Sequence, residues 1–185
     1  MMHIPVLLNE VIRLLDPSPG EIIIDGTVNG GGYAQAILEK LGDQGKFLGI
    51  DWDRKILEKT RANLQLPTSD FQLQLIDDNY ANLPKILEKL GWDRADGLVL
   101  DLGFSSEQLE ESGRGFSFRK DEPLIMTYSD EEKPVKEILK RFKEEELAAI
   151  IKNFGEERFA RRIAKAIREH EKKKPIETSG ELARI

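Results

Sequence analysis

The chain has 185 residues and a formal net charge of −6, with 39% hydrophobic and 34% charged residues, the composition of a soluble globular protein. It has no cysteine, which excludes disulfides and thiolate metal sites, and its two histidines lie far apart, so no metal is expected. The negative charge argues against a generic nucleic-acid coat. With no long apolar stretch and no signal peptide, the sequence predicts a cytoplasmic protein without a membrane segment.

Four short apolar runs in the first hundred residues predict strands. Three of them are rich in Ile, Leu and Val, as expected of strands that are covered on both faces of a sheet. These runs are residues 21–25, 46–51 and 96–101. The fourth, residues 71–77 with Phe71 first, alternates apolar side chains with glutamines, which predicts an edge strand with one wetter face.

Helical patterns separate these strands. Apolar side chains recur at i, i+3, i+4 and i+7, which places them on one face of a helix. The helices are predicted over residues 33–41, 54–64 and 82–90. Strands and helices that alternate at this spacing form right-handed crossovers and a parallel sheet. The sequence therefore predicts an α/β fold with spatial strand order 3-2-1-4 and a switch point between the first and fourth strands.

The pattern changes near residue 105, which divides the chain into a core, 1–105, and a second part, 106–185. Residues 105–124 have the composition of a loop, and only helical patterns follow. These helices are predicted over residues 134–142, 144–153 and 156–171. Gly155 stands where a glycine would end the second of them.

The last residues contain a capping box, Thr178-x-x-Glu181, which predicts the start of a further helix. A helix that short does not stand alone, and a four-stranded doubly wound sheet is small. We therefore expect an incomplete fold: a truncated chain, or a half completed by a second copy or by a missing C-terminal part.

Basic residues are concentrated late in the chain. Residues 131–185 carry 15 Lys and Arg against 12 Asp and Glu, a balance of +3 in a chain whose total is −6. The densest basic stretch is residues 157–174. Such a stretch is usually a solvated helix face, and the alternative is an arm that contacts nucleic-acid phosphates.

A glycine-rich segment follows the first strand. Asp25 and Gly26 come first, and Gly30, Gly31 and Gly32 precede the next helix. Missing side chains let ligand atoms approach the backbone, and the amides of the following helix point outward. The spacing is neither G-x-G-x-x-G nor a P-loop, so it does not predict a phosphate cradle. The alternative is an ordinary β–α turn.

The ends of the other strands carry polar or aromatic side chains. Asp51 ends the second strand, where a carboxylate accepts both hydroxyls of a ribose; an N-cap role suits Asp53 better. Tyr80 follows the third strand and can stack on adenine or pack in a core. Asp101 follows the fourth strand at the switch point. A nucleoside site without a phosphate grip favours S-adenosylmethionine over NAD or ATP.

Six segments resemble the MraW family of S-adenosylmethionine-dependent methyltransferases, in the family's order and over nearly the whole chain. They are "HIPVLLNEV", "DGTVNGGGYAQAIL", "GIDWD", "DGLVLDLGFSSEQL", "RGFSF" and "FGEERFARRIAKAI". The resemblance implies a Rossmann-like methyltransferase core with a small helical subdomain. It implies methylation of N4 of a cytidine in small-subunit ribosomal RNA, with that RNA or the ribosomal particle as partner. It also implies cofactor contacts from Gly31, Gly32, Tyr33, Asp51, Tyr80, Asp101 and Gln108.

Some of these positions depart from the family pattern. Tyr33 stands where the family usually has histidine, Asn29 where it has glycine, and Tyr80 where it has phenylalanine. Gln108 has an alternative role, because Ser105-x-x-Gln108 also has the spacing of a capping box.

The largest departure is "PLIMTY", residues 123–128, where the family typically has P-L-D-M-R-M. Ile125 and Thr127 replace an acid and an arginine, so a charged pair becomes neutral. The family chain is also longer than this one, so we expect weaker cofactor binding than in a complete relative. The alternative function is a catalytically impaired relative that binds cofactor or RNA. A methyltransferase with another substrate and an NAD-dependent oxidoreductase are more distant alternatives.

No motif assigns the catalytic group. Cytosine N4 shares its lone pair with the ring, so an acceptor for its amino protons would assist methyl transfer, and Asp101 or a nearby carbonyl is the candidate. The target base must be single-stranded or flipped out. Arg114, Phe116 and Phe118 can contact RNA, and the alternative is loop packing with a surface arginine.

Overall fold

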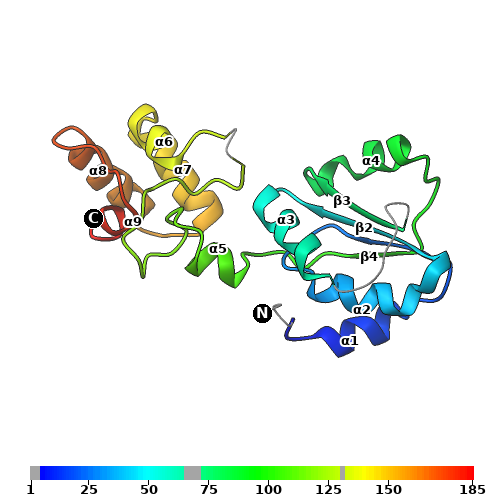
Figure 1. Ribbon diagram of the computed structural model, residues 1–185. Coiled ribbons are helices and arrows are strands. Elements are labelled where there is room, and N and C mark those ends of the chain that lie inside the picture. The colour runs from blue at the N-terminus through cyan, green and yellow to red at the C-terminus, as the bar shows by residue number, and fades with distance from the viewer. Residues whose placement is uncertain (1–4, 65–71, 130–131) are drawn as a thin grey trace. The chain divides into compact units, whose positions relative to one another are not determined.

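A computed structural model describes residues 5–64, 72–129 and 132–185. The chain divides into two compact units, Met1–Gly103 and Phe104–Ile185, whose elements are labelled in Figure 1. Phe71, with which the predicted edge strand begins, lies outside the described residues.

A parallel sheet of four strands forms the centre of the first unit. The strands are β1 (Ile22–Asp25), β2 (Lys46–Asp51), β3 (Leu73–Asp77) and β4 (Gly97–Val99). Their order in the sheet is β3-β2-β1-β4, and every pair is parallel (Figure 1). This confirms the predicted α/β fold, the strand order and the edge position of the third strand.

The fourth strand is shorter and more exposed than predicted. The apolar run 96–101 predicted a strand covered on both faces, but only Gly97–Val99 pairs. Its position at the second edge of the sheet agrees with the predicted order 3-2-1-4. Val99 is buried, while Leu98 and Leu100 are 47% and 42% exposed. An apolar run alone does not show whether both faces of a strand are covered, so the prediction that both faces of this strand are covered is wrong.

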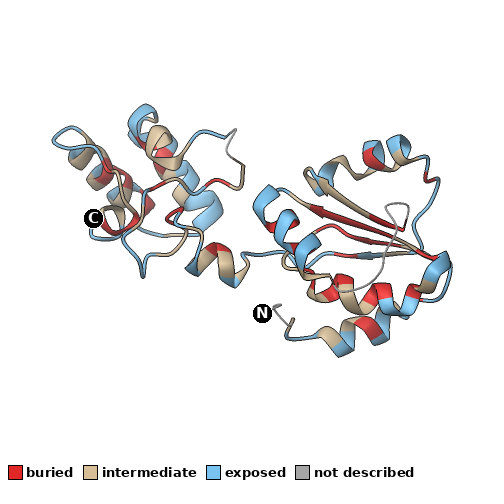
Figure 2. Cartoon of the chain, viewed as in Figure 1, coloured by how far each residue is buried: buried red, intermediate tan, exposed pale blue. Residues whose placement is uncertain are grey.

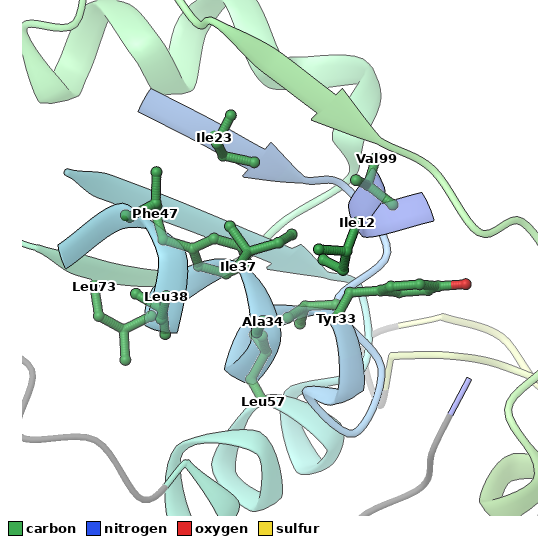
Figure 3. Close-up of a cluster of buried hydrophobic side chains, with 12 residues drawn as sticks. Ile12, Ile23, Tyr33, Ala34, Ile37, Leu38, Phe47, Leu57, Leu73 and Val99 are labelled. Carbon is green, nitrogen blue, oxygen red and sulfur yellow. The ribbon is translucent and has the colours of Figure 1, made fainter. Parts of the chain in front are cut away.

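Helices cover both faces of the sheet. They are α1 (Leu8–Leu15), α2 (Gly32–Leu41), α3 (Arg54–Asn63) and α4 (Leu83–Leu90), with 3-10 turns at Gly42–Gln44 and Tyr80–Asn82. Side chains alternate along a strand, so Ile23 and Phe47 face α1, α2 and α3, while Ile24 and Leu48 face α4. Figure 2 shows the two central strands, β1 and β2, as largely buried, and Figure 3 shows the first cluster. The three predicted helices are confirmed within one residue; α1 was not predicted.

The second unit is helical. Its helices are α5 (Ser106–Glu110), α6 (Val135–Arg141), α7 (Glu144–Gly155), α8 (Ala160–Glu171) and α9 (Ser179–Ala183). Leu124, Leu139, Ala164 and Ile176 are among the buried side chains of its core. Gly155 does not end α7 as predicted: it is the last helical residue, and Glu156 takes the left-handed conformation with φ 52°.

The short last helix is held by the segment before α6. Thr178 caps α9 as predicted, accepting a hydrogen bond from the Glu181 amide at 3.2 Å. The Ser179 amide donates to the Glu122 carbonyl at 2.9 Å, and the Gly180 amide donates to Asp121 Oδ1 at 3.1 Å. These bonds give the helix the partner that its length requires. Within the described residues, no helix is long and apolar enough to cross a membrane.

Ile37 tests the packing of α2 on the sheet. Its side chain is fully buried in the cluster of Figure 3, so Ile37→Ala leaves a cavity and should lower the free energy of unfolding by about 2–5 kcal/mol. Both tryptophans, Trp52 and Trp92, lie in the first unit, so tryptophan fluorescence in urea follows this unit. Leu14→Ala, at a position 79% exposed, is the control and should change stability by less than about 0.5 kcal/mol. Equal midpoints for the two variants would contradict this packing.

Candidate functional site

The loop after β1 is attached to the ends of the neighbouring strands. The Gly26 amide donates to the Val99 carbonyl and the Val28 amide to the Ile50 carbonyl, both at 3.0 Å. A Cβ at Gly26 would lie 2.6 Å from Leu100 Cδ2, so a side chain there would collide with its neighbour. The glycine-rich loop therefore lies across the carboxyl ends of β2, β1 and β4.

Asp51 holds the bend of this loop. Its Oδ2 accepts a hydrogen bond from the Asn29 amide at 3.1 Å, and its Oδ1 accepts one from the Asp53 amide at 2.9 Å. Asn29 and Gly31 both have left-handed conformations, with φ 46° and 86°. Asparagine is one of the few residues other than glycine that adopts this region at low cost, so it can stand where glycine is usual. Asp51 and the glycine bend thus face one site.

Helix α3 supports the same bend from its other side. Asp53 caps the helix, as predicted, by accepting from the Lys55 amide at 3.2 Å. The hydroxyl of Thr60, which is fully buried, bonds the Asn29 carbonyl and the Ile56 carbonyl. Thr60 was not predicted as a site residue; the available signal was a small polar residue four positions after Ile56, on the apolar stripe of this helix.

A second hydrogen-bonded chain links the end of β1 with the end of β4. Asp25 is fully buried, and its Oδ1 accepts from the Thr27 amide at 3.0 Å and from the Thr27 hydroxyl at 3.4 Å. The Thr27 hydroxyl oxygen in turn accepts from the Asp101 amide at 2.7 Å. Asp25 Oδ2 is buried and has no hydrogen-bond partner among the residues that the structure describes. Neither Asp25 nor Thr27 was predicted as a site residue.

Acidic side chains dominate the electrostatics at the carboxyl ends of the strands. Burial raises the pKa of Asp25 to about 7; hydrogen bonds from Thr27 oppose this, and Asp51 and Asp101 add to it. Burial also raises the pKa of Asp51 to about 6, against the opposing effect of its backbone hydrogen bonds. The pKa of the Tyr33 phenol is raised by burial and by Asp101 and Asp25, and Figure 3 shows its hydroxyl pointing away from the hydrophobic cluster.

Six of the seven predicted site residues lie in the first unit, around these strand ends. Tyr80 follows β3, with its Cβ 3.2 Å from where a Cβ of Gly26 would lie, and it is 44% exposed rather than packed in the core. Asp101 is exposed. The six residues are Gly31, Gly32, Tyr33, Asp51, Tyr80 and Asp101. In the residues described, no group of three or more His, Cys, Asp or Glu side chains is arranged to hold a metal ion.

Gln108 lies in the second unit, where it is buried and takes part in a capping box. Its Oε1 accepts from the Ser105 amide at 3.0 Å, and its own amide donates to Ser105 Oγ at 3.1 Å. The alternative role that the spacing allowed is therefore present.

The loop residues considered for RNA contact divide into two kinds. Arg114 is buried, and its Nη1 donates to the carbonyls of Thr127 and Tyr128 at 3.1 and 3.0 Å, so it is not a surface arginine. Phe116 packs against Phe104 and Tyr128, with ring centroids 5.0 and 5.6 Å apart. Phe118 is 79% exposed. The Arg114 side chain therefore joins two parts of the same loop by hydrogen bonds.

The model of the MraW methylase family matches residues 1–185. The chain belongs to the MraW methylase family. The ribosomal RNA small subunit methyltransferase H of Clostridium botulinum is 42% identical over 185 residues, which are 99% of this chain and 59% of that protein. The protein of the same name from Deinococcus deserti is 40% identical over 100% of this chain and 59% of its own. The chain thus spans about three-fifths of the length of these curated MraW relatives.

Among solved structures, an S-adenosylmethionine-dependent O-methyltransferase from Thermotoga maritima aligns with a TM-score of 0.42 and 19% identity, over 53% of this chain and 35% of that one. The assignment to the MraW family does not rest on this likeness.

The buried acids predict an inverted pH dependence of stability. An acid whose pKa rises on folding binds protons more tightly in the folded state, so its contribution is present at low pH and is lost as the pH rises, here between 3.8 and about 7 for Asp25. The first unit should therefore gain about 1–3 kcal/mol when the pH is lowered from 8 to 5. Urea titrations followed by tryptophan fluorescence measure this gain.

The substitution Asp25→Asn should remove the larger part of the gain, because the amide does not titrate. Asp96→Asn is a matched control: Asp96 accepts from the Ile22 amide at 2.9 Å at the opposite end of the same sheet. A wild-type profile that falls steadily from pH 8 to pH 5 would contradict the burial of unpaired acids at this site.

Proposed function

We propose that this member of the MraW family is an S-adenosylmethionine-dependent methyltransferase that acts on N4 of a cytidine in small-subunit ribosomal RNA. The proposal that the cofactor is S-adenosylmethionine is carried by the hydrogen bond from the Asn29 amide to Asp51. This bond brings a carboxylate next to the open backbone of the glycine-rich loop. The RNA part is supported by family membership and by the names of the relatives.

The residues at the strand ends fit the cofactor. A carboxylate has about four lone-pair sites, and backbone amides, those of Asn29 and Asp53 among them, do not use all of those of Asp51, so the carboxylate can still accept a ribose hydroxyl. The partly exposed Tyr80 ring offers a face for adenine. Apart from Gly30 itself and its chain neighbours, no described residue has an atom within 4 Å of where a Cβ of Gly30 would be, which leaves room for a ligand along the bend. We assign Gly31, Gly32, Tyr33 and Asp101 to the remaining contacts. Gln108 is assigned on the family resemblance alone.

S-adenosylmethionine, when bound, supplies a methyl group on a positively charged sulfur. The protein's task is then to position the acceptor nitrogen in line with that methyl group, and positioning provides most of the rate. Asp101 is exposed at the switch point, and its backbone is fixed by Thr27. Its carboxylate can accept a hydrogen bond from the N4 amino group, which localises the nitrogen lone pair and takes up the proton.

The basic side chains of the stretch 157–174 differ in their partners. Arg168 Nη1 donates to the Leu139 carbonyl at 2.8 Å, and Lys165 pairs with Glu169 at 3.9 Å. At the start of α8, however, the guanidinium groups of Arg158 and Arg162 lie 4.5 and 5.3 Å from the centre of the Phe159 ring. This ring is 46% exposed. We infer that the Phe159 cluster (Arg158, Phe159 and Arg162) contacts single-stranded RNA by stacking and by phosphate pairing.

The alternative, a catalytically impaired relative, gains no support from the segment that suggested it. Residues 123–128 are ordered by backbone bonds, because the Ile125 and Met126 amides donate to the Arg114 carbonyl at 3.2 and 2.8 Å. The neutral residues Ile125 and Thr127 therefore leave the loop in place. Transfer of labelled methyl groups to small-subunit RNA or particles separates the two functions: only the active enzyme labels the RNA at cytidine N4.

Asp51 is the test of the cofactor site. Asp51→Asn keeps one oxygen acceptor but loses the charge and half of the acceptor capacity for ribose hydroxyls. We expect S-adenosylmethionine affinity to fall by on the order of tenfold to a hundredfold, the worth of one or two charge-assisted hydrogen bonds. Isothermal titration calorimetry measures it, with Asp96→Asn as the control. Unchanged affinity in Asp51→Asn would remove this carboxylate from the site.

The Phe159 cluster is tested by two variants that differ in kind. Phe159→Leu keeps apolar volume but removes the ring, and should weaken binding of a single-stranded RNA by on the order of tenfold, with an unchanged salt dependence. Arg161→Ala removes an exposed charge from the same helix away from the ring, and should mainly reduce the slope of log affinity against log salt, by about one. Equal effects of the two variants on affinity and slope would show that the ring does not stack on a base.

A further inference from the structure

Asp25 is a buried acid to which the mechanism above gives no role. Its side chain is fully buried, Oδ1 accepts hydrogen bonds from Thr27, and Oδ2 has no hydrogen-bond partner in the described parts of the chain. An unpaired carboxylate in such a place is costly, so natural proteins rarely keep one without a reason. Its location at the end of β1, one residue before the glycine-rich loop, puts that charge beside the proposed cofactor site.

The groups around Asp25 come from every element at this end of the sheet. Asp51 ends β2, Asp101 follows β4, Tyr33 lies in the first turn of α2, and Thr27 belongs to the loop. The charged side chains that act most strongly on Asp25 are Asp51 and Asp101, and both are acidic. Within the described residues, therefore, the charge that would best compensate Asp25 is a positive one brought by a ligand.

The proposed reaction changes the charge of the cofactor by one unit. A bond forms between the methyl carbon and N4, the sulfur–carbon bond breaks, and its electron pair stays on sulfur. The acceptor nitrogen loses a proton to the base. The positively charged sulfonium thus becomes a neutral thioether, while ribose, adenine and the amino-acid part are unchanged.

We propose that Asp25 enables the site to distinguish the sulfonium cofactor from its thioether product, acting through space on the charge of the sulfur. The inference rests on the proposed function, because it requires S-adenosylmethionine as the ligand. Asp25 is a positioning residue in this scheme: its Oδ2 is shielded from solvent, so its charge and not a contact makes the difference. Between charges that are poorly exposed to water, such an interaction is strong and weakly screened by salt.

The same arrangement links cofactor binding to a proton. Burial keeps much of Asp25 protonated near neutral pH, with a pKa of about 7. A nearby cation favours the charged form, so binding of the sulfonium should expel a proton, and binding of the thioether should not. The pKa of Asp51 is about 6, but Asp51 faces the ribose, which both ligands share. The titration of Asp51 therefore changes both affinities equally and has no effect on their ratio.

The experiment compares S-adenosylmethionine with S-adenosylhomocysteine by calorimetry at pH 6.5 and pH 8.5. For a pKa near 7 that falls by about one unit on binding, the ratio of the two affinities should rise about threefold over this interval in the wild-type chain. In Asp25→Asn the ratio should not rise. The ligands' own amines titrate alike with both proteins, and Asp96→Asn should behave as the wild type.

A second measurement needs no variant. At pH 6.5, in buffers of different ionisation enthalpy, S-adenosylmethionine should release about half a proton more than S-adenosylhomocysteine. Equal proton release, or a pH-dependent ratio that persists in Asp25→Asn, would overturn the role of Asp25 while leaving the cofactor site intact. Failure of the wild-type chain to bind either ligand would instead overturn the proposed function, and this inference with it.

Discussion

The hydrogen bond from the Asn29 amide to Asp51 is the interaction on which the site depends. It joins the loop after β1 to the end of β2, and with the bond from Asp53 it fixes both carboxylate oxygens. The residue whose amide binds Asp51, Asn29, has a left-handed backbone, and Gly31, which takes the same conformation, starts α2. The turn that begins the helix and the turn that orients the carboxylate are thus one structure.

This arrangement is built at the expense of local stability. Asp25 and Asp51 are buried acids with raised pKa values, and each destabilises the folded state at neutral pH relative to an exposed acid. Burial of apolar side chains on both faces of the sheet offsets this destabilisation. Ile23, Phe47 and Leu48 are almost completely buried there. Rules that otherwise govern a fold are commonly broken at functional sites, and here the broken rule is that buried charges are paired. A cationic ligand would restore it.

The strand order and most helices could be predicted from the sequence, because they depend on local periodicity and on the chirality of βαβ units. The exposure of Leu98 could not be predicted, because an apolar run does not show which face of an edge strand stays open. At the site, Asp51 and Asp101 were recognisable as polar residues that follow apolar strands. The role of Thr27 was not recognisable, because it depends on a hydrogen bond with the Asp101 amide, 74 positions away in the sequence. Full burial of Asp25 is likewise a tertiary property.

The segment 123–128 shows how a departure from a family pattern must be weighed against structure. Thr127 stands where the family typically has arginine, and its side chain is buried, so an exposed cation is absent at this point of the loop. The order of the loop comes instead from Arg114, whose guanidinium binds two carbonyls and whose own carbonyl accepts two amides. The two amides and the two carbonyls that Arg114 binds are backbone groups of the segment. The bonds therefore do not depend on which side chains stand at positions 125 and 127. The substitutions therefore change the charge that the loop presents to a ligand and not the path of its backbone.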